Sequence, residues 1–179
     1  MDSYKRPIKL NTYKDMENMV KSDNYKDKIY DIVVNTFEVT CYMFPLEEWE
    51  AADEKERNFF EKGIRSVVGF NGAATGKMII EPSSGEFLTA MAANMLGIEA
   101  PDAEEKSGAL CEVANIICGN TVPLFAHDDQ ICYIEPPSVL QETENMDGDI
   151  DAMKKESVHV YLDEGAVRIT VYYTMEEEL

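Results

Sequence analysis

One segment of the chain reads Ala109-Leu110-Cys111-Glu112-Val113-Ala114-Asn115-Ile116-Ile117-Cys118-Gly119, which is apolar except for one glutamate and one asparagine. Glu112 and Asn115 are three residues apart, so in a helix they share one face and lie about 4.5 Å apart along its axis. Counting by three and four residues adds Gly108 and Gly119 to the same stripe. We therefore predict a helix over residues 103–120, with one polar stripe on an otherwise apolar surface and with Asp102 as a plausible N-cap.

The two glycines of this stripe have two explanations. Glycine inside a helix is destabilising by about 1 kcal/mol relative to alanine. In the first explanation, Gly108 and Gly119 remove side-chain bulk around Glu112 and Asn115, so that the surface of another molecule can come down on them. In the second, Gly108 starts the helix, Gly119 ends it, and the polar pair merely faces water. The first predicts a docking surface and the second a solvated face.

The composition of the chain is that of an acidic globular protein. Its 179 residues suit one domain, and a hydrophobic content of 45% allows a substantial core. Lysine and arginine number 16 against 35 aspartates and glutamates, which gives a formal net charge of −19. Such a chain repels nucleic acids and anionic membranes, so we expect neither as a partner.

The spacing of the cysteines and the lack of long apolar runs indicate in which cellular compartment the protein is located. None of the four cysteines has CxxC spacing, and Cys111 and Cys118 would lie about 10 Å apart on one helix, too far for a disulfide. We expect all four to be reduced, and no metal site, because neither histidine has a partner at ligand spacing. The N-terminus has no apolar signal region, and no run approaches the roughly 18 apolar residues of a membrane span. The expected location is therefore the cytoplasm.

The first part of the chain is expected to hold a polar arm and a helix. Residues 1–26 are polar and weakly periodic, and a single domain is expected to span residues 27–179. Apolar residues recur at helical spacing over residues 27–44, which predicts an amphipathic helix that ends before Pro45. Residues 46–62 are strongly acidic at first and should be exposed.

Alternating apolar residues predict two antiparallel hairpins. Residues 64–70 and 74–81 flank Asn71-Gly72, a dipeptide typical of tight turns. Residues 156–173 alternate on both sides of a central turn, which indicates a second hairpin with one buried face. Residues 131–134 form a short apolar run between the two, and we predict a short strand there.

A further helix is predicted after the first hairpin. Ser83 and Ser84 are candidate N-caps, the helix runs to Leu96, and Gly97 closes it. Residues 141–153 carry five acidic residues and are predicted to form a mobile loop. Together these elements predict an α+β fold, in which a mainly antiparallel sheet has two long helices packed on one side.

Several motifs of nucleotide and hydrolase chemistry are absent. The sequence contains no G-x-x-x-x-G-K-[ST], no G-x-G-x-x-G after a strand, no G-x-S-x-G and no H-E-x-x-H. The glycine-containing segment 70–77 joins two predicted strands, so it places no helix N-terminus at a phosphate. No cofactor of its own is therefore expected.

With these elements predicted, the polar stripe resembles the active-helix motif of the bacterial chemotaxis phosphatases of the CheC/CheX/FliY group. Their active helix carries E-x-x-N followed four residues later by glycine, which here is Glu112-Val113-Ala114-Asn115 and Gly119. The hairpin strand at 72–81, the helix end at 90–97 and Pro136-Pro137-Ser138 resemble the family pattern in the same order. The resemblance covers most of the chain.

Within this group the chain is most similar to the CheX branch. CheC-like members carry a second E-x-x-N on the first long helix, where residues 31–38 of this sequence have no glutamate three positions before an asparagine. FliY-like members add a flagellar switch domain, for which this chain has no room. One departure is Gly108, because the family often has aspartate or serine at that position.

The resemblance implies that the substrate is a phosphoryl-aspartate on a CheY-like response regulator. Asn115 would hold a water in line with the phosphorus, because an uncharged amide donates and accepts hydrogen bonds without repelling the phosphoryl oxygens. Glu112 would pair with a lysine of the regulator. Gly108, Gly119 and Asn120 would form the docking surface around them. The divalent cation, Mg²⁺, would belong to the regulator.

Two other functions fit the sequence: a binding module of the same fold that docks a regulator without hydrolysis, and a structural dimerisation domain. The terminal hairpin is long and β-branched, and a strand of this kind at a sheet edge has to be covered or paired. We expect it to pair with the same edge of a second chain in a homodimer, as CheX-like proteins are known to do. The alternative is a monomer in which residues 141–153 or the N-terminal arm cover the edge.

Overall fold

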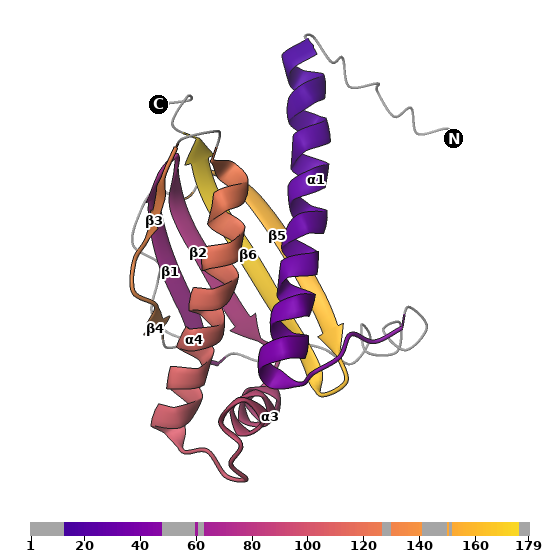
Figure 1. The fold of residues 1–179 in the computed structure, drawn as a ribbon, viewed down its shortest axis with the longest axis vertical. Coiled ribbons are helices and arrows are strands. Elements are labelled where there is room, and N and C mark those ends of the chain that lie inside the picture. The colour runs from indigo at the N-terminus through magenta and orange to yellow at the C-terminus, as the bar shows by residue number, and fades with distance from the viewer. Residues whose placement is uncertain are drawn as a thin grey trace, which may run out of the picture.

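In the part of the chain that the structure describes, an antiparallel sheet of six strands forms one layer. The computed structural model describes residues 13–47, 60, 63–126, 130–140, 150 and 152–175. The strand order is β3-β1-β2-β6-β5, and β4 also pairs with β1 (Figure 1). The strands are β1 (Arg65–Gly72), β2 (Ala74–Pro82), β3 (Cys132–Ile134), β4 (Ser138–Leu140), β5 (Lys154–Leu162) and β6 (Gly165–Met175).

Helices form the second layer, on one face of the sheet. They are α1 (Tyr13–Thr36), which continues as the π-helix η1 (Phe37–Cys41), α3 (Gly85–Leu96), and α4 (Ala103–Thr121), which continues as the 3₁₀-helix η2 (Val122–Phe125). Figure 1 shows α1 and α4 across the same face, with α3 at one end of the sheet. The predicted α+β fold with two long helices on one side is confirmed.

The core between the sheet and the helices contains a cluster of aromatic rings. Phe125 of η2 is fully buried and stacks on Tyr173 of β6, with 4.4 Å between ring centroids. Its ring also lies 6.1 Å from that of Phe70 on β1 and meets Tyr25 of α1 edge-on at 5.3 Å. Aromatic pairs favour these offset and edge-on geometries. The cluster joins the end of α4 to α1 and to the sheet, so it fixes how α4 lies on the sheet.

The predicted helix caps are present. Ser84 Oγ accepts a hydrogen bond from the Phe87 N–H at 3.1 Å, and Gly97 closes α3 in the left-handed conformation at φ 67°. At the start of α4, Asp102 Oδ1 accepts from the Glu105 N–H at 2.9 Å, and Glu105 Oε2 accepts from the Asp102 N–H at 2.7 Å. This capping box satisfies backbone donors that a helix N-terminus leaves open.

Both predicted hairpins are present as well. The first turns at Gly72, whose φ is 112° and where a Cβ would collide with the backbone carbonyl of Ile131, so only glycine fits. The second is formed by β5 and β6, which pair from Lys154 to Leu162. The short strand predicted at 131–134 is β3. Strand β4 was not predicted, because its three residues follow two prolines and are held only by pairing with β1.

The first helix begins earlier than the sequence indicated. It starts at Tyr13, inside the arm predicted for residues 1–26, and its first turns extend beyond the end of the sheet (Figure 1). Residues 13–26 lack a clear apolar period, but they contain no proline or glycine to interrupt a helix. The α-helix ends at Thr36 and a π-helical turn continues it to Cys41, where a helix to residue 44 was predicted.

Some predictions fall on residues outside the described ones. Residues 1–12 of the predicted arm belong to this group. So does most of the acidic segment 46–62, of which only Leu46, Glu47 and Phe60 are described. The predicted loop at 141–153 is described only at its end, and its mobility stays a prediction.

The four cysteines are free thiols, as the sequence predicted. Cys41 and Cys118 are fully buried, and burial raises the pKa of each thiol to about 12. Cys111 and Cys132 are only partly buried. Because the thiolate is the reactive form, the two buried thiols are inert at neutral pH.

One helix is long and apolar enough to cross a membrane, although the sequence analysis expected no such run. By length and composition it extends from Ala103 to Phe125. Half of its apolar 18-residue window is buried inside the protein, where α4 packs on the sheet. Helices buried in a core are apolar for the same reason as membrane spans, and this one is the core helix of the fold.

Only one strand of the terminal hairpin lies at the edge of the sheet. Strand β6 pairs with β2 on one side and with β5 on the other, so β5 is the edge. Residues 44–46 cover one end of it: the Leu46 N–H donates to the Tyr161 carbonyl, and the Asp163 N–H donates to the Phe44 carbonyl, each at 3.0 Å. This covering segment is neither of the two considered from the sequence.

Candidate active site on the exposed face of α4

The polar stripe lies on the side of α4 that faces away from the core. Gly108, Glu112, Gly119 and Asn120 are exposed, and Asn115 is half-buried. The residues that α4 buries against the sheet and the other helices are Ala109, Leu110, Val113, Ala114, Ile117, Cys118 and Thr121. The polar pair therefore lies on one outward face of the helix, as its spacing predicted.

Both glycines of the stripe lie within α4, and neither starts nor ends it. A Cβ atom added to Gly108 would meet no atom within 4 Å, and one added to Gly119 would meet only Ile134 Cδ1, at 3.9 Å. Neither glycine has a positive φ. Nothing within the described chain therefore requires glycine at either position, and the explanation in which they cap the helix is wrong.

The side chains of the stripe differ in how they are held. Glu112 and Asn115 make no hydrogen bond or ion pair with another described residue. Asn120 Nδ2, in contrast, donates to the backbone carbonyl of Ile116 at 2.9 Å. Asn120 is therefore tied to its own helix, whereas the functional groups of Glu112 and Asn115 are available to another molecule.

The charges on α4 are mostly negative. Lys106 is its one basic residue, against Glu104, Glu105 and Glu112. In the described part of the chain, no three His, Cys, Asp or Glu side chains are placed to hold a metal ion. The stripe therefore offers an amide and a carboxylate, and the one cation of the helix, Lys106, is not part of it.

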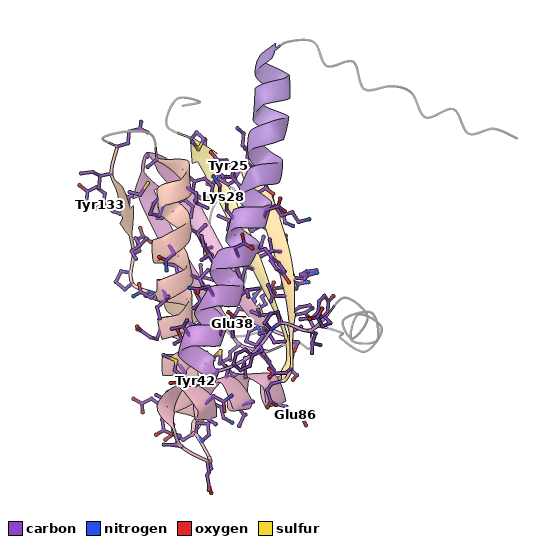
Figure 2. The ribbon with its side chains drawn as sticks, turned by 45° about the vertical axis from the view of Figure 1, so that its right-hand side comes forward. Tyr25, Lys28, Glu38, Tyr42, Glu86 and Tyr133 are labelled. Atoms are coloured by element: carbon purple, nitrogen blue, oxygen red, sulfur yellow. The ribbon has the colours of Figure 1, made fainter. Side chains whose placement is uncertain are left out.

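Three exposed apolar residues, Ile131, Tyr133 and Ile134, lie at the edge of the sheet, and of these Ile134 is the one beside the stripe. Side chains alternate along a strand, so Ile134 points to the face that carries α4 and Tyr133 to the other face. These residues belong to β3 or precede it, and their exposed fractions are 62%, 60% and 39%. Figure 2 shows Tyr133 at the edge of the sheet, pointing away from the ribbon. Ile134 is the neighbour of Gly119 described above. The sequence predicted a short strand here but not that its apolar side chains are exposed, because three residues are too few to show which face of the strand is in contact with solvent.

The shape of the stripe limits what it can act on. It is the convex surface of a helix, and small-molecule sites are concave and bury most of the ligand. A convex surface is suited to a macromolecule that brings its own reactive group to Glu112 and Asn115. The arrangement can position a water through the amide and pair with a cation through the carboxylate.

The fold is similar to solved structures of chemotaxis proteins. CheX from Desulfovibrio desulfuricans matches with a TM-score of 0.65 and 14% identity, covering 84% of this chain and 99% of that one. CheX from Vibrio vulnificus matches with a TM-score of 0.62 and 15% identity, covering 84% and 96%. CheX in the CheX-CheY-BeF3-Mg²⁺ complex from Borrelia burgdorferi matches with a TM-score of 0.58 and 22% identity, covering 83% and 97%.

The family comparison is more specific than the likeness of folds. A comparison with curated protein sequences returns no match. The family model described as "Chemotaxis phosphatase CheX" matches residues 64–162, which is more than half of the chain and includes β1, β2, α3, all of α4 and β5. Together with a fold that matches CheX structures over most of its length, this shows that the chain belongs to the CheX family of chemotaxis phosphatases.

Proposed function

We propose that this protein hydrolyses the phosphoryl-aspartate of a CheY-like response regulator, using Asn115 and Glu112 on α4. The observation that carries the proposal is the open stripe: an amide and a carboxylate without described partners, between two glycines whose Cβ positions are nearly empty. Membership of the CheX family and the crystal structure of a complex of Borrelia burgdorferi CheX with CheY support the choice of substrate.

Asn115 positions the attacking water. Hydrolysis of a phosphoryl group depends mostly on positioning and on stabilising charge, with little covalent help from the enzyme. The Asn115 amide accepts a hydrogen bond from the water through Oδ1 and donates one through Nδ2, which orients the oxygen toward the phosphorus. Because the amide is uncharged, it does not repel the phosphoryl oxygens as a carboxylate would.

Glu112 docks the regulator. An exposed carboxylate beside a phosphoryl group is repelled by it, so Glu112 is unsuited to contact the phosphate. It is suited to pair with a lysine of the regulator near the phosphorylated aspartate, one helical turn from Asn115. This pairing sets the register in which Asn115 meets the phosphoryl group.

The magnesium ion belongs to the regulator in this scheme. Mg²⁺ bound there neutralises the charge on the phosphoryl oxygens. That division of roles suits α4, which has a single basic residue. No cofactor of this chain takes part in the proposed reaction.

The docking surface consists of Gly108, Gly119 and Asn120, extended by the side chain of Ile134 on β3. The glycines let the surface of the regulator approach α4 closely. Ile134 is apolar and 39% exposed, so the regulator can bury its side chain on docking. We propose the cytoplasm as the location, where a soluble regulator is available, with no nucleic acid or membrane as partner.

The direct test is the loss of phosphate from a regulator that carries labelled phosphoryl-aspartate. Addition of this protein in catalytic amounts is expected to accelerate release of inorganic phosphate above the rate of the regulator alone. A stoichiometric complex without acceleration would identify a binding module instead. If the protein neither binds a regulator from the same organism nor accelerates release of its phosphate, the proposed function is wrong.

Gly108→Ala is expected to change stability and activity in opposite directions. Alanine at this position meets no neighbour and removes a helix penalty of about 1 kcal/mol, so the free energy of unfolding should rise by up to that amount. The added methyl group lies on the proposed docking surface. The family often has the larger aspartate or serine there, so we expect the regulator of this chain to use the space that Gly108 leaves, and affinity for the phosphorylated regulator should fall. Urea unfolding and a binding titration measure the two effects.

Gly85→Ala is the matched control for this substitution. Gly85 lies at the start of α3, away from the stripe, and a Cβ there also meets nothing within 4 Å. It should leave affinity for the regulator unchanged. Unchanged affinity in Gly108→Ala as well would exclude Gly108 from the docking surface.

We also propose a homodimer that forms through the part of β5 that no described residue covers. The Tyr161 carbonyl points to the outer edge, since Leu46 bonds to it there. In an antiparallel strand, every second residue directs its backbone groups to the same edge, so Ser157 also points outward. A sedimentation mass near twice the 20.2 kDa chain mass is expected at micromolar concentration.

Ser157→Pro tests the strand-pairing mechanism. Proline there removes an N–H at the outer edge and no backbone hydrogen bond to β6; the only contact with β6 that it removes is that of the Ser157 hydroxyl with the Thr170 hydroxyl, at 3.3 Å. The fold should therefore be kept while pairing between chains is lost. The mass should fall to that of one chain. A dimer that persists in Ser157→Pro would show that the chains associate through another surface. Substitutions in β6 cannot serve, because β6 lies inside the sheet.

A further inference from the structure

Three large apolar side chains are exposed where the first helix ends. They are Val39, Tyr42 and Phe44, and their exposed fractions are 68%, 68% and 52%. The residues of the same segment that are fully buried in the core are Phe37, Cys41 and Met43. The three exposed side chains therefore point away from the core, and we call them the η1 patch.

The backbone of Tyr42 is strained. Its φ is 53° and its ψ is 36°, and among the described residues it is the only one other than glycine with a positive φ. Helix ends usually place glycine at such a position, as α3 does with Gly97, because a Cβ there crowds the backbone. Within the described part of the chain, the Tyr42 hydroxyl has no hydrogen-bond partner. The fold therefore does not require a tyrosine here.

The turn that presents Tyr42 is also unusual. The segment η1 is a π-helix, a rare structure that is frequently found at functional sites. The N–H groups of Tyr42 and Met43 both donate to the Phe37 carbonyl, the second of them at 3.2 Å. These bonds and the burial of Met43 hold the turn in place. Strain at a fixed and exposed position indicates a function of the side chain rather than a contribution to stability.

The η1 patch and the polar stripe belong to the same helical layer. Helices α1 and α4 pack against each other, and both η1 and α4 pack against α3. Figure 1 shows that α1 and α4 run in opposite directions, so η1 lies on the side of the first half of α4. That half carries Gly108 and Glu112. Packed helices have axes about 8–10 Å apart, so the two surfaces are close neighbours.

The stripe by itself is too small to hold a protein partner. Two of its residues are glycines, whereas a stable protein–protein interface covers about 800 Å² and about 20–30 residues on each side. A disc of that area centred on Glu112 has a radius of about 16 Å, which exceeds the distance between packed helices. A partner docked on the stripe therefore extends over the end of α1. Tyrosine is among the residues that most often anchor such interfaces.

We propose that Tyr42, with Val39 and Phe44, forms a second contact with the response regulator, which docks across η1 and the stripe of α4 together. This inference rests on the proposed function, because it assigns the same partner to a further surface. The η1 patch contributes to affinity, while Asn115 and Glu112 keep the roles given above. The contact also accounts for a strained and exposed tyrosine that the fold itself does not need.

Tyr42→Ala is the direct test. The dissociation constant for a beryllofluoride-activated regulator should rise by roughly tenfold, as for the loss of an anchoring side chain from an interface. In turnover of the phosphorylated regulator, KM should rise while kcat stays unchanged, because Asn115 and Glu112 are untouched. Calorimetric titration and steady-state phosphate release measure the two effects.

Tyr133→Ala is the matched control. Tyr133 is 60% exposed, similar to Tyr42, but it points to the face of the sheet that carries no helix, and Figure 2 shows it far from Tyr42. Its affinity for the regulator should equal that of the unchanged protein. Equal affinities of Tyr42→Ala and Tyr133→Ala would overturn this inference and leave the proposed function intact. If the unchanged protein does not bind the regulator, both are wrong.

Tyr42→Gly separates the side chain from the backbone. Glycine adopts a positive φ freely, so the melting temperature should exceed that of Tyr42→Ala, whereas the affinity should fall equally in both variants. Normal affinity in Tyr42→Gly would show that the loss in Tyr42→Ala comes from the backbone, and the inference would be wrong. It would also be wrong if Tyr42→Ala changed the sedimentation mass and not the affinity, because the patch would then contact a second copy of the chain.

Discussion

Asn115→Ala is expected to reduce turnover of a phosphorylated response regulator by about a hundredfold, the usual order for a misplaced attacking group. The side chain is half-buried on the outward face of α4 and bonds to no other described residue, so its loss should leave the fold intact. Affinity for the regulator should change little, because Glu112 and the glycines remain. Single-turnover release of labelled phosphate measures the effect.

The control for this prediction is Asn94→Ala. Asn94 is an exposed asparagine on α3, so the same atoms are removed from a helix outside the stripe. That variant should turn over at the normal rate. Equal rates for Asn115→Ala and the unchanged protein would exclude Asn115 as the residue that positions the water.

Glu112→Lys is expected to weaken the complex with the regulator by about 2–5 kcal/mol, which corresponds to roughly 30-fold or more in the dissociation constant. The substitution places a lysine where the proposed partner is also a lysine, so an attraction becomes a repulsion. Glu112 is exposed and has no described partner, so the folded state should tolerate the change. Calorimetric titration with a beryllofluoride-activated regulator measures the affinity.

Two further variants separate a specific contact from general charge. Glu112→Gln keeps the size of the side chain and removes only its charge, so its effect should be milder. Glu86→Lys changes the net charge by the same amount from an exposed position on α3 (Figure 2). If Glu112→Lys binds as well as Glu86→Lys, the docking role assigned to Glu112 is wrong.

The two main variants are expected to fail at different steps. Asn115→Ala should bind and not hydrolyse, whereas Glu112→Lys should hydrolyse slowly because it binds poorly. Raising the protein concentration should therefore rescue Glu112→Lys and not Asn115→Ala. The two effects can be separated because neither side chain bonds to a described residue and neither belongs to the core, so each substitution should leave the fold unchanged.

The features that could be predicted from the sequence depend on interactions between residues close in the chain. The capping box joins Asp102 to a residue three positions later, and the Ser84 cap spans the same distance. The turn at Gly72 needs a conformation that glycine adopts freely. The outward position of Glu112 and Asn115 followed from a helical period within one apolar run.

Features that involve distant residues could not be predicted in this way. The exposure of Tyr133 depends on β3 being the outer neighbour of β1, more than fifty residues away in the chain. The cover over the end of β5 comes from residues 44–46, which no local signal connects with Tyr161. The first helix was predicted to start too late, because residues 13–26 lack the apolar period that indicates a buried face.

The sequence by itself determined the local elements of this protein, the antiparallel character of its sheet and the two polar side chains that α4 presents. Those follow from backbone preferences and from periods of two or 3.6 residues, which are local properties of a chain. Only the tertiary structure decided that β6 is central and β5 the edge, and that β3 and β4 both pair with β1. Strand order and cross-strand neighbours are set by pairing between distant segments, which side-chain periodicity does not encode.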